Sequence, residues 1–175
     1  MSTYKIDPAH SEIGFKIKHL VISTVSGYFS KFDATMERNG DDFTDAAVSF
    51  EADVDSISTN SEQRDTHLRS EDFFHAAEHP KVTFKSTSIE KKGDNEYVLH
   101  GDLTIRGVKN KIALNVEHGG SATDPWGQSK EGFDLTGKIS RKEFGLKWNA
   151  LTEAGGALVS DDVRLIMSVQ MIKQP

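Results

Sequence analysis

Apolar side chains recur at every second position through most of this chain. Ile13, Phe15 and Ile17, for example, alternate with glycine and lysine. Successive side chains of an extended strand point to opposite faces of a sheet, so this period predicts strands with one buried and one solvent-exposed face. The pattern occurs in about eight stretches, which are residues 13–17, 24–38, 48–54, 82–84, 97–105, 112–116, 133–139 and 163–171. The sequence therefore predicts an all-β protein.

Short connections that contain glycine separate these stretches. Lys92–Asp94, Arg106-Gly107 and Gly119-Gly120 are typical of hairpin turns, and no proline falls inside a predicted strand. Consecutive hairpins form antiparallel sheets, and because each strand has one apolar face we expect the sheet to close on itself. No linker, repeat or low-complexity tract divides the chain, which predicts a single domain over residues 1–175.

Residues 59–79 break the alternation and predict two short helices between strands. Thr59 to Glu62 form a capping-box pattern with Thr59 as the N-cap, and Ser70-Glu71-Asp72 resembles a second helix start. Pro80 ends the segment. Leu68, Phe73 and Phe74 would form its apolar face, so we expect the two helices to lie across one mouth of the barrel.

The balance of charges excludes two classes of partner. The chain has 21 Lys and Arg residues against 27 Asp and Glu residues, a net charge of −6. Nucleic-acid-binding domains need a basic face, and so does electrostatic docking on anionic lipids, so neither is expected. The absence of cysteine excludes disulfides, thiolate metal sites and cysteine nucleophiles.

Two features of the sequence bear on membranes and localisation. No apolar run is long enough to form a membrane-spanning segment. The N-terminus lacks the pattern of a signal peptide. We therefore expect a cytoplasmic protein, or a periplasmic one if a leader has been removed.

One motif resembles a metal site. His75 to His79 read His-Ala-Ala-Glu-His, the H-x-x-E-H pattern of inverted zincins, in which two imidazoles one helical turn apart bind one metal. Pro80 would end the helix inside the motif and leave the directions of the ligands poorly fixed. We therefore expect no metal.

No catalytic motif is evident elsewhere. The chain lacks a G-x-S-x-G elbow and glycine-rich phosphate or dinucleotide loops, so we expect neither a catalytic residue nor a cofactor. Arg64, Asp65 and His67 form a polar group on the first predicted helix. Two interpretations stay open for this group: a hydrogen-bonded cluster that joins helix and barrel, or contacts with a ligand.

Five blocks of sequence, in order, resemble the YceI family of lipocalin-like, polyisoprenoid-binding proteins. They are Asp7–Ser11 with Phe15 and His19-Leu20; Gly27–Phe29 with Phe32; Arg64–Leu68 with Asp72–Phe74 and His79-Pro80; Leu103–Val108; and Arg141–Leu146. The resemblance implies an eight-stranded antiparallel β-barrel around a long apolar pore. It also implies an amphiphilic lipid as partner, of isoprenoid quinone-like or other long-chain type.

The candidate ligand-binding residues follow from the alternation and the predicted mouth. The apolar pore walls would come from Ile13, Phe15, Ile17, Phe50, Phe84, Leu99, Leu114, Phe133, Leu135 and Leu165. The lipid headgroup would contact His19, Arg64, His67 and Trp148. Gly101 and Gly137 interrupt apolar faces, either to keep the pore open or to relieve barrel bending; Gly137 is also a candidate lining residue.

The function we favour is binding, storage or transport of a long-chain amphiphilic lipid, which is a polyisoprenoid, a quinone-like molecule or a fatty-acid-like molecule. One alternative is a barrel enzyme that acts on a hydrophobic substrate, which would need an acid and a base inside the pore. Another is a structural or stress-response domain whose core is packed with phenylalanine and holds no ligand. A homodimer is an open alternative for the assembly.

Overall fold

The computed structural model describes residues 1–40, 42–149 and 159–175. Over these residues the chain forms an eleven-stranded antiparallel sheet, one α-helix and three short 3-10 helices. The strands are β1 (Ser2–Ile6), β2 (Glu12–His19), β3 (Ser23–Phe29), β4 (Phe32–Arg38), β5 (Ala47–Asp53), β6 (Ile57–Ser58), β7 (Lys81–Lys91), β8 (Glu96–Ile105), β9 (Val108–Thr123), β10 (Ser129–Ser140) and β11 (Val159–Lys173). The helices are α1 (Glu62–Arg69), η1 (Pro8–His10), η2 (Val54–Ser56) and η3 (Arg141–Phe144).

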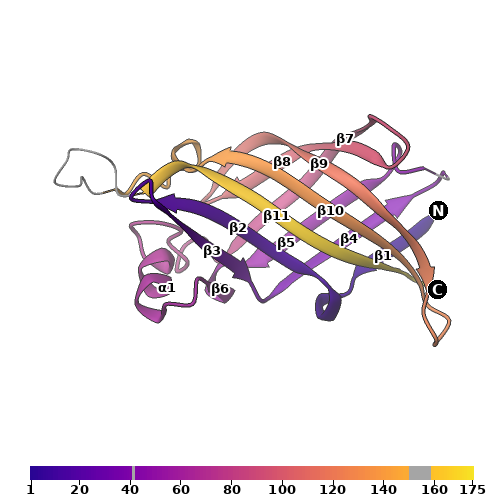
Figure 1. Ribbon diagram of the computed structural model, residues 1–175, viewed down its shortest axis with the longest axis horizontal. Helices are drawn as coiled ribbons and strands as arrows, with labels where there is room; N and C mark the ends of the chain where they lie inside the picture. Colours follow the sequence, from indigo (N-terminus) through magenta and orange to yellow (C-terminus); the bar gives the residue numbers. More distant parts are fainter. Residues whose placement is uncertain (41, 150–158) are drawn as a thin grey trace.

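Eight of the strands close into a barrel. Their order is β1-β4-β5-β7-β8-β9-β10-β11, and β11 pairs back with β1 through Tyr4 opposite Lys173 (Figure 1). The longer β11 also pairs with β2, which pairs with β3 and then β6, so these three strands extend the wall toward α1. The predicted all-β, eight-stranded antiparallel barrel is confirmed.

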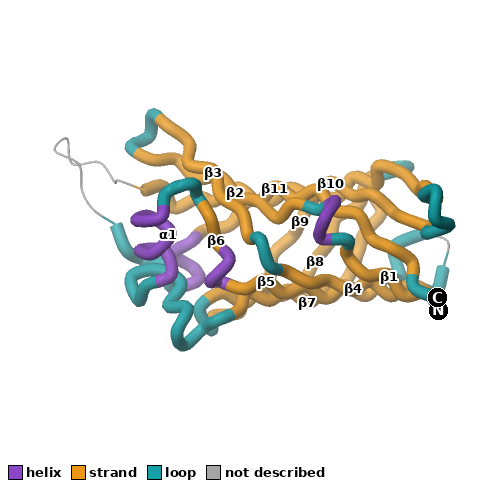
Figure 2. The backbone as a smooth tube through the Cα atoms, turned by 90° about the horizontal axis from the view of Figure 1, so that it is seen from below, coloured by secondary structure: helices purple, strands orange, loops and turns teal. Residues whose placement is uncertain are grey.

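The two ends of the barrel differ in what covers them. Figure 2 shows α1 and its connecting turns at one end and both chain termini at the other. The hairpin between β2 and β3 reaches the α1 end, because His19 pairs with Val159 at the start of β11. The β9–β10 connection lies at the termini end, where Lys130 pairs with Ile172. Among the described residues, no helix has the length and apolarity needed to cross a membrane.

One of the predicted turns is present and another is not. Arg106 and Gly107 form a two-residue hairpin turn with φ values of +51° and +73°. Gly119 and Gly120, in contrast, lie inside β9, which continues to Thr123. Because Gly120 pairs with Gly132 while His118 pairs with Phe133, Gly119 has no opposite residue and forms a β-bulge. The prediction of a turn at Gly119-Gly120 was wrong.

The two predicted helices are reduced to one. Helix α1 begins after Ser61, whose Oγ accepts from the backbone N–H of Arg64 at 3.3 Å, and not after Thr59 as predicted. Asn60 has a φ of +62°, which turns the chain between these two residues. The second predicted helix is a series of turns, because His75 takes the left-handed conformation with a φ of +52°.

A ligand-binding cavity with one polar end

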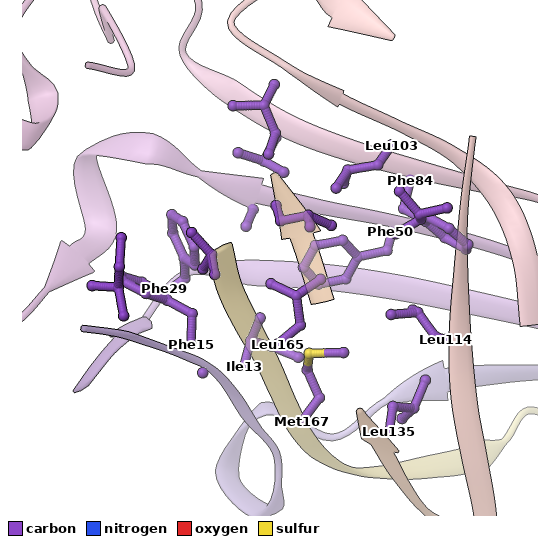
Figure 3. Close-up of a pocket in the computed structure, with 18 of the residues that line it drawn as sticks. Ile13, Phe15, Phe29, Phe50, Phe84, Leu103, Leu114, Leu135, Leu165 and Met167 are labelled. Atoms are coloured by element: carbon purple, nitrogen blue, oxygen red, sulfur yellow. The ribbon is translucent and has the colours of Figure 1, made fainter. Parts of the chain in front are cut away.

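The barrel encloses a cavity of about 620 Å³. Its walls follow the period of two, since successive side chains of a strand alternate between inside and outside. On β11 this places every second residue on the cavity, from Val163 through Leu165 and Met167 to Met171. Figure 3 shows apolar side chains from several strands turned toward this space. The cavity is therefore a tube with mainly apolar walls.

All but one of the predicted ligand-binding residues line this cavity. They are Ile13, Phe15, Ile17, His19, Phe50, Arg64, His67, Phe84, Leu99, Leu114, Phe133, Leu135, Trp148 and Leu165. Their contact with a ligand stays a prediction. Sequence reasoning missed other lining residues, although the same alternation points to Val163, Met167 and Val169 on β11.

Gly137 is the exception, and its neighbours explain why. A side chain built at Gly137 would collide with the side chain of Leu114 on β9, and one built at Gly101 would collide with the ring of Phe84. These two glycines therefore leave room for a large side chain of the adjacent strand to lie flat against the sheet. Gly137 does not line the cavity as predicted, because Leu114 covers it.

Polar lining residues gather at the α1 end of the tube. Thr59, Ser61, Gln63, Arg64 and His67 belong to α1 or the segment that leads into it. Lys18 and His19 end β2, and Arg141 begins η3, which are also at this end. No Asp or Glu among the described residues lines the cavity. The cavity thus offers hydrogen-bond donors and positive charge at one end and apolar walls beyond it.

Arg64 is held in place by Thr59. Its Nε donates to Thr59 Oγ1 at 2.7 Å, and its Nη2 donates to the Thr59 carbonyl at 2.5 Å. The Thr59 hydroxyl in turn donates to Oδ1 of buried Asp65 at 2.6 Å. These contacts use two of the five N–H donors of the guanidinium. Arg64 and Asp65 therefore belong to a hydrogen-bonded cluster with Thr59, while Arg64 also lines the cavity. Its contact with a ligand stays a prediction.

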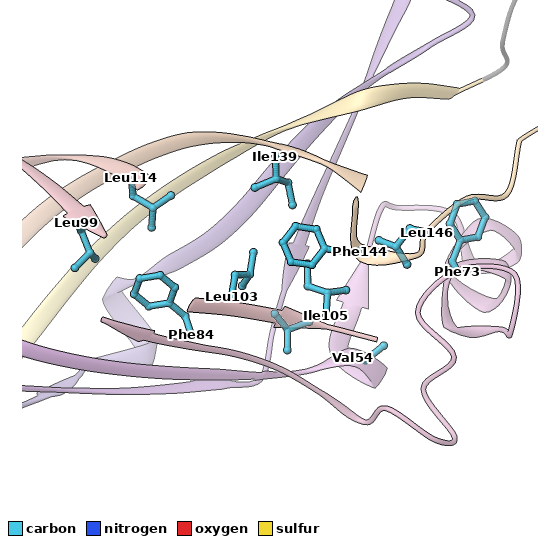
Figure 4. Packing of buried hydrophobic residues seen from close by; sticks show 11 residues of the cluster. Val54, Phe73, Phe84, Leu99, Leu103, Ile105, Leu114, Ile139, Phe144 and Leu146 are labelled. Atoms are coloured by element: carbon cyan, nitrogen blue, oxygen red, sulfur yellow. The ribbon is translucent and has the colours of Figure 1, made fainter. Parts of the chain in front are cut away.

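His67 and Trp148 form an aromatic group at the same end. The ring centroids of His67 and Trp148 are 4.7 Å apart, and Phe73 lies 5.1 Å from His67. The Nε2 of His67 is 2.8 Å from a carboxylate oxygen of Asp72. Figure 4 shows Phe73, Leu146 and Phe144 packed together near this end of the barrel. The mouth of the cavity is therefore partly built by rings.

Arg141 is the buried cation that sequence reasoning named only as part of a motif. Its guanidinium donates to the backbone carbonyls of Leu146, Trp148, Val159 and Ser160. Only 2% of the residue is exposed, and this burial lowers its pKa. The pKa of neighbouring Asp161 is also lowered, chiefly by the hydrogen bond from Ser140 Oγ. Arg141 thus ties the segment that carries Trp148 to the first residues of β11.

The opposite end of the tube is closed by packed rings. Phe43 is 5% exposed and its centroid lies 5.0 Å from that of Phe133 and 5.7 Å from that of Tyr97. The buried carboxylate of Glu131 lies beside this group. It accepts a hydrogen bond from Arg38 Nη2 at 3.4 Å, and its other oxygen lies 2.7 Å from His118 Nε2. The packed rings of Phe43, Tyr97 and Phe133 separate the apolar tube from solvent at the termini end.

The His-Ala-Ala-Glu-His motif lies in the turns that follow α1. The ligand atoms of His75, Glu78 and His79 are all within 4.8 Å of one another, but Glu78 is largely exposed. Zinc–nitrogen bonds of about 2.0–2.1 Å place tetrahedral ligands roughly 3.3 Å apart, so these side chains would have to approach one another.

We therefore expect the purified protein to contain no stoichiometric zinc. Elemental analysis of protein dialysed without chelator checks this expectation. One zinc per chain would contradict it. Loss of that zinc in a His75→Ala variant would place the metal at this motif, and its persistence would place the metal elsewhere.

The barrel and its cavity define a lipocalin-like protein with an apolar interior and one polar mouth. Within that class, the sequence matches the YceI-like domain over residues 4–171, and the chain belongs to the YceI family. Protein YceI of Escherichia coli O157:H7 is 39% identical over 173 residues, which cover 98% of this chain and 87% of that protein. The resemblance noted in the sequence is confirmed.

Solved structures support the same assignment. The YCEI protein of Campylobacter jejuni has a TM-score of 0.78 at 34% identity, covering 97% of this chain and 96% of its own. A polyisoprenoid binding domain from Saccharophagus degradans, described as implicated in plant cell wall breakdown, has a TM-score of 0.68 at 14% identity, covering 98% of each chain. At that identity the second similarity shows the fold alone.

Proposed function

We propose that this protein binds one long-chain amphiphilic lipid, with the chain inside the barrel and the headgroup at the α1 end, and that it stores or transports this lipid. The observation that carries the proposal is the segregation of the cavity walls, whose charged residues and histidines all lie at one end. A volume of about 620 Å³ is within the range of pockets that hold small molecules. The proposal is also supported by the family of the chain, because a polyisoprenoid binding domain shares its fold.

Apolar walls are sufficient to bind the lipid chain. Each buried CH₂ group contributes about 0.8 kcal/mol, so several isoprene or methylene units offset the cost of ordering a flexible chain. The headgroup is constrained by the donors at the mouth. Arg64, Lys18 and His19 donate hydrogen bonds or carry positive charge, and no described acid faces them across the cavity. This favours a headgroup that accepts hydrogen bonds, such as a carbonyl, carboxylate or phosphate.

The same walls argue against the two alternatives. A barrel enzyme that uses acid–base chemistry needs an acid and a base near its substrate. Beyond Lys18, His19 and His67 at the mouth, the described lining residues include no carboxylate, histidine or lysine. A structural domain would have a packed core, whereas this barrel holds a cavity far larger than one water molecule. Binding without catalysis is therefore the function we propose.

Native mass spectrometry of protein purified without detergent tests this proposal. We expect one lipid adduct per chain, which solvent extraction then identifies as a long-chain molecule with an acceptor headgroup. After delipidation, a long-chain fatty acid should bind more tightly than an alkylammonium of equal chain length, because the mouth offers cations. Protein that carries no lipid and binds neither probe would refute the proposal.

A further inference from the structure

The hairpin between β2 and β3 ends in three exposed apolar side chains. Leu20, Val21 and Ile22 are 38%, 80% and 85% exposed, and no polar residue separates them. Single apolar residues on a surface are normal, but a run of them at the tip of a turn is costly in water unless it serves a contact. The tip therefore has the character of a binding element.

The backbone of the tip is also strained. Leu20 and Val21 have φ values of +55° and +66°, in the left-handed region that favours glycine and asparagine. A β-branched residue is rare there, and such strain persists mainly at functional sites. The Arg106-Gly107 turn of the same barrel places a glycine at its second position. The hairpin thus keeps apolar side chains where a glycine would relieve strain.

The position of the tip connects it to the cavity. Lys18 and His19, which directly precede Leu20, both line the polar mouth. Figure 1 shows the β2–β3 hairpin at the same end of the barrel as α1. Trp126, another exposed large apolar residue, lies in the β9–β10 connection at the opposite end. The exposed apolar tip therefore adjoins the opening through which a lipid would pass.

We propose that the tip formed by Leu20, Val21 and Ile22 inserts into the interfacial layer of a lipid bilayer and holds the cavity mouth against the membrane. This inference rests on the proposed lipid binding. A stable protein interface takes roughly 20–30 residues from each partner. A three-residue tip therefore suits a fluid lipid surface better than the surface of a folded protein. The net charge of −6 does not favour anionic headgroups, so apolar burial drives insertion and a neutral bilayer suffices.

Flotation with phosphatidylcholine vesicles tests the insertion. The variant Leu20→Asn/Val21→Gly/Ile22→Ser removes the apolar tip and supplies residues that tolerate the left-handed conformation, so it should fold at least as stably as the native chain. We expect its vesicle affinity to fall by about tenfold or more, because three apolar side chains no longer leave water. Trp126→Ser, at the opposite end, is the matched control and should bind vesicles like the native protein.

A transfer assay separates this inference from the proposed function. We expect the tip variant to bind a fluorescent long-chain fatty acid in solution with unchanged affinity, but to extract it from vesicles at least about tenfold more slowly. Unchanged flotation and transfer in a variant that still binds the fatty acid would overturn the insertion alone. Native protein that binds vesicles but no fatty acid or extractable lipid would overturn lipid binding and leave the insertion supported.

Discussion

Replacing Leu165 with tryptophan is expected to lower the affinity for a long-chain lipid by about a hundredfold. Leu165 lies on the cavity wall, where β11 pairs with β2 on one side and β10 on the other. A larger side chain there would occupy space that about four CH₂ groups of the ligand need, at roughly 0.8 kcal/mol each. A lipid whose chain is short enough to end before Leu165 should lose far less affinity. Isothermal titration with fatty acids of increasing length measures the difference.

The adjacent residue supplies a matched control. Ile166 is 40% exposed and faces outward from the same strand, so Ile166→Trp adds the same side chain to the outer surface. It should bind all chain lengths like the native protein. Overpacking a solid core costs about 1–3 kcal/mol, so melting must be recorded for both variants. Unchanged long-chain affinity in folded Leu165→Trp would show that the lipid does not occupy this part of the cavity.

Replacing Arg141 with methionine is expected to lower the free energy of unfolding by about 3 kcal/mol. Methionine fills much of the volume but leaves four backbone carbonyls without the guanidinium that now donates to them. An unpaired buried acceptor costs about 1–3 kcal/mol, and part of this total is offset because a buried charge is removed. Arg141→Lys should also be destabilised, since an ammonium cannot reproduce the planar fork of donors.

Urea unfolding followed by circular dichroism measures this loss. Arg164, which is exposed on the outer face of β11, provides the control variant Arg164→Met, which should change stability by less than about 0.5 kcal/mol. An Arg141→Met protein as stable as Arg164→Met would show that the four carbonyls find other partners. Ligand binding by the folded variant should weaken, because the segment that carries Trp148 is no longer tied to β11.

The barrel could be predicted because its physical cause is visible in the sequence. Alternation is imposed by the geometry of strands, so the inward positions of β2, β8, β10 and β11 could be identified without knowing how the strands pair. The division of residues 24–38 into β3 and β4 could not be predicted. It depends on a bend at Ser30 and Lys31, whose backbones hydrogen-bond to residues 53–56. Closure between β1 and β11 likewise depends on contacts distant in sequence.

The candidate site shows the same division. Leu165 was placed on the wall correctly, whereas Gly137 was not, because its cover comes from Leu114 on another strand. Arg141 was not assigned a role, since its partners are backbone carbonyls, which leave no trace in the side-chain pattern. The apolar tip at Leu20 to Ile22 could not be identified from the alternation pattern. It is recognised only from the exposure of its side chains and its backbone conformation.

The pairing of β1 with β11 has a consequence for how the protein is made. Tyr4 pairs with Lys173, so during synthesis β1 cannot gain its partner on that side until the chain has been made as far as β11. Until then both edges of the growing sheet are unpaired and can associate with other chains. Pairing between residues so far apart in the sequence makes completion of the barrel slow. Nascent chains of this protein should depend on chaperones more than its final stability would suggest.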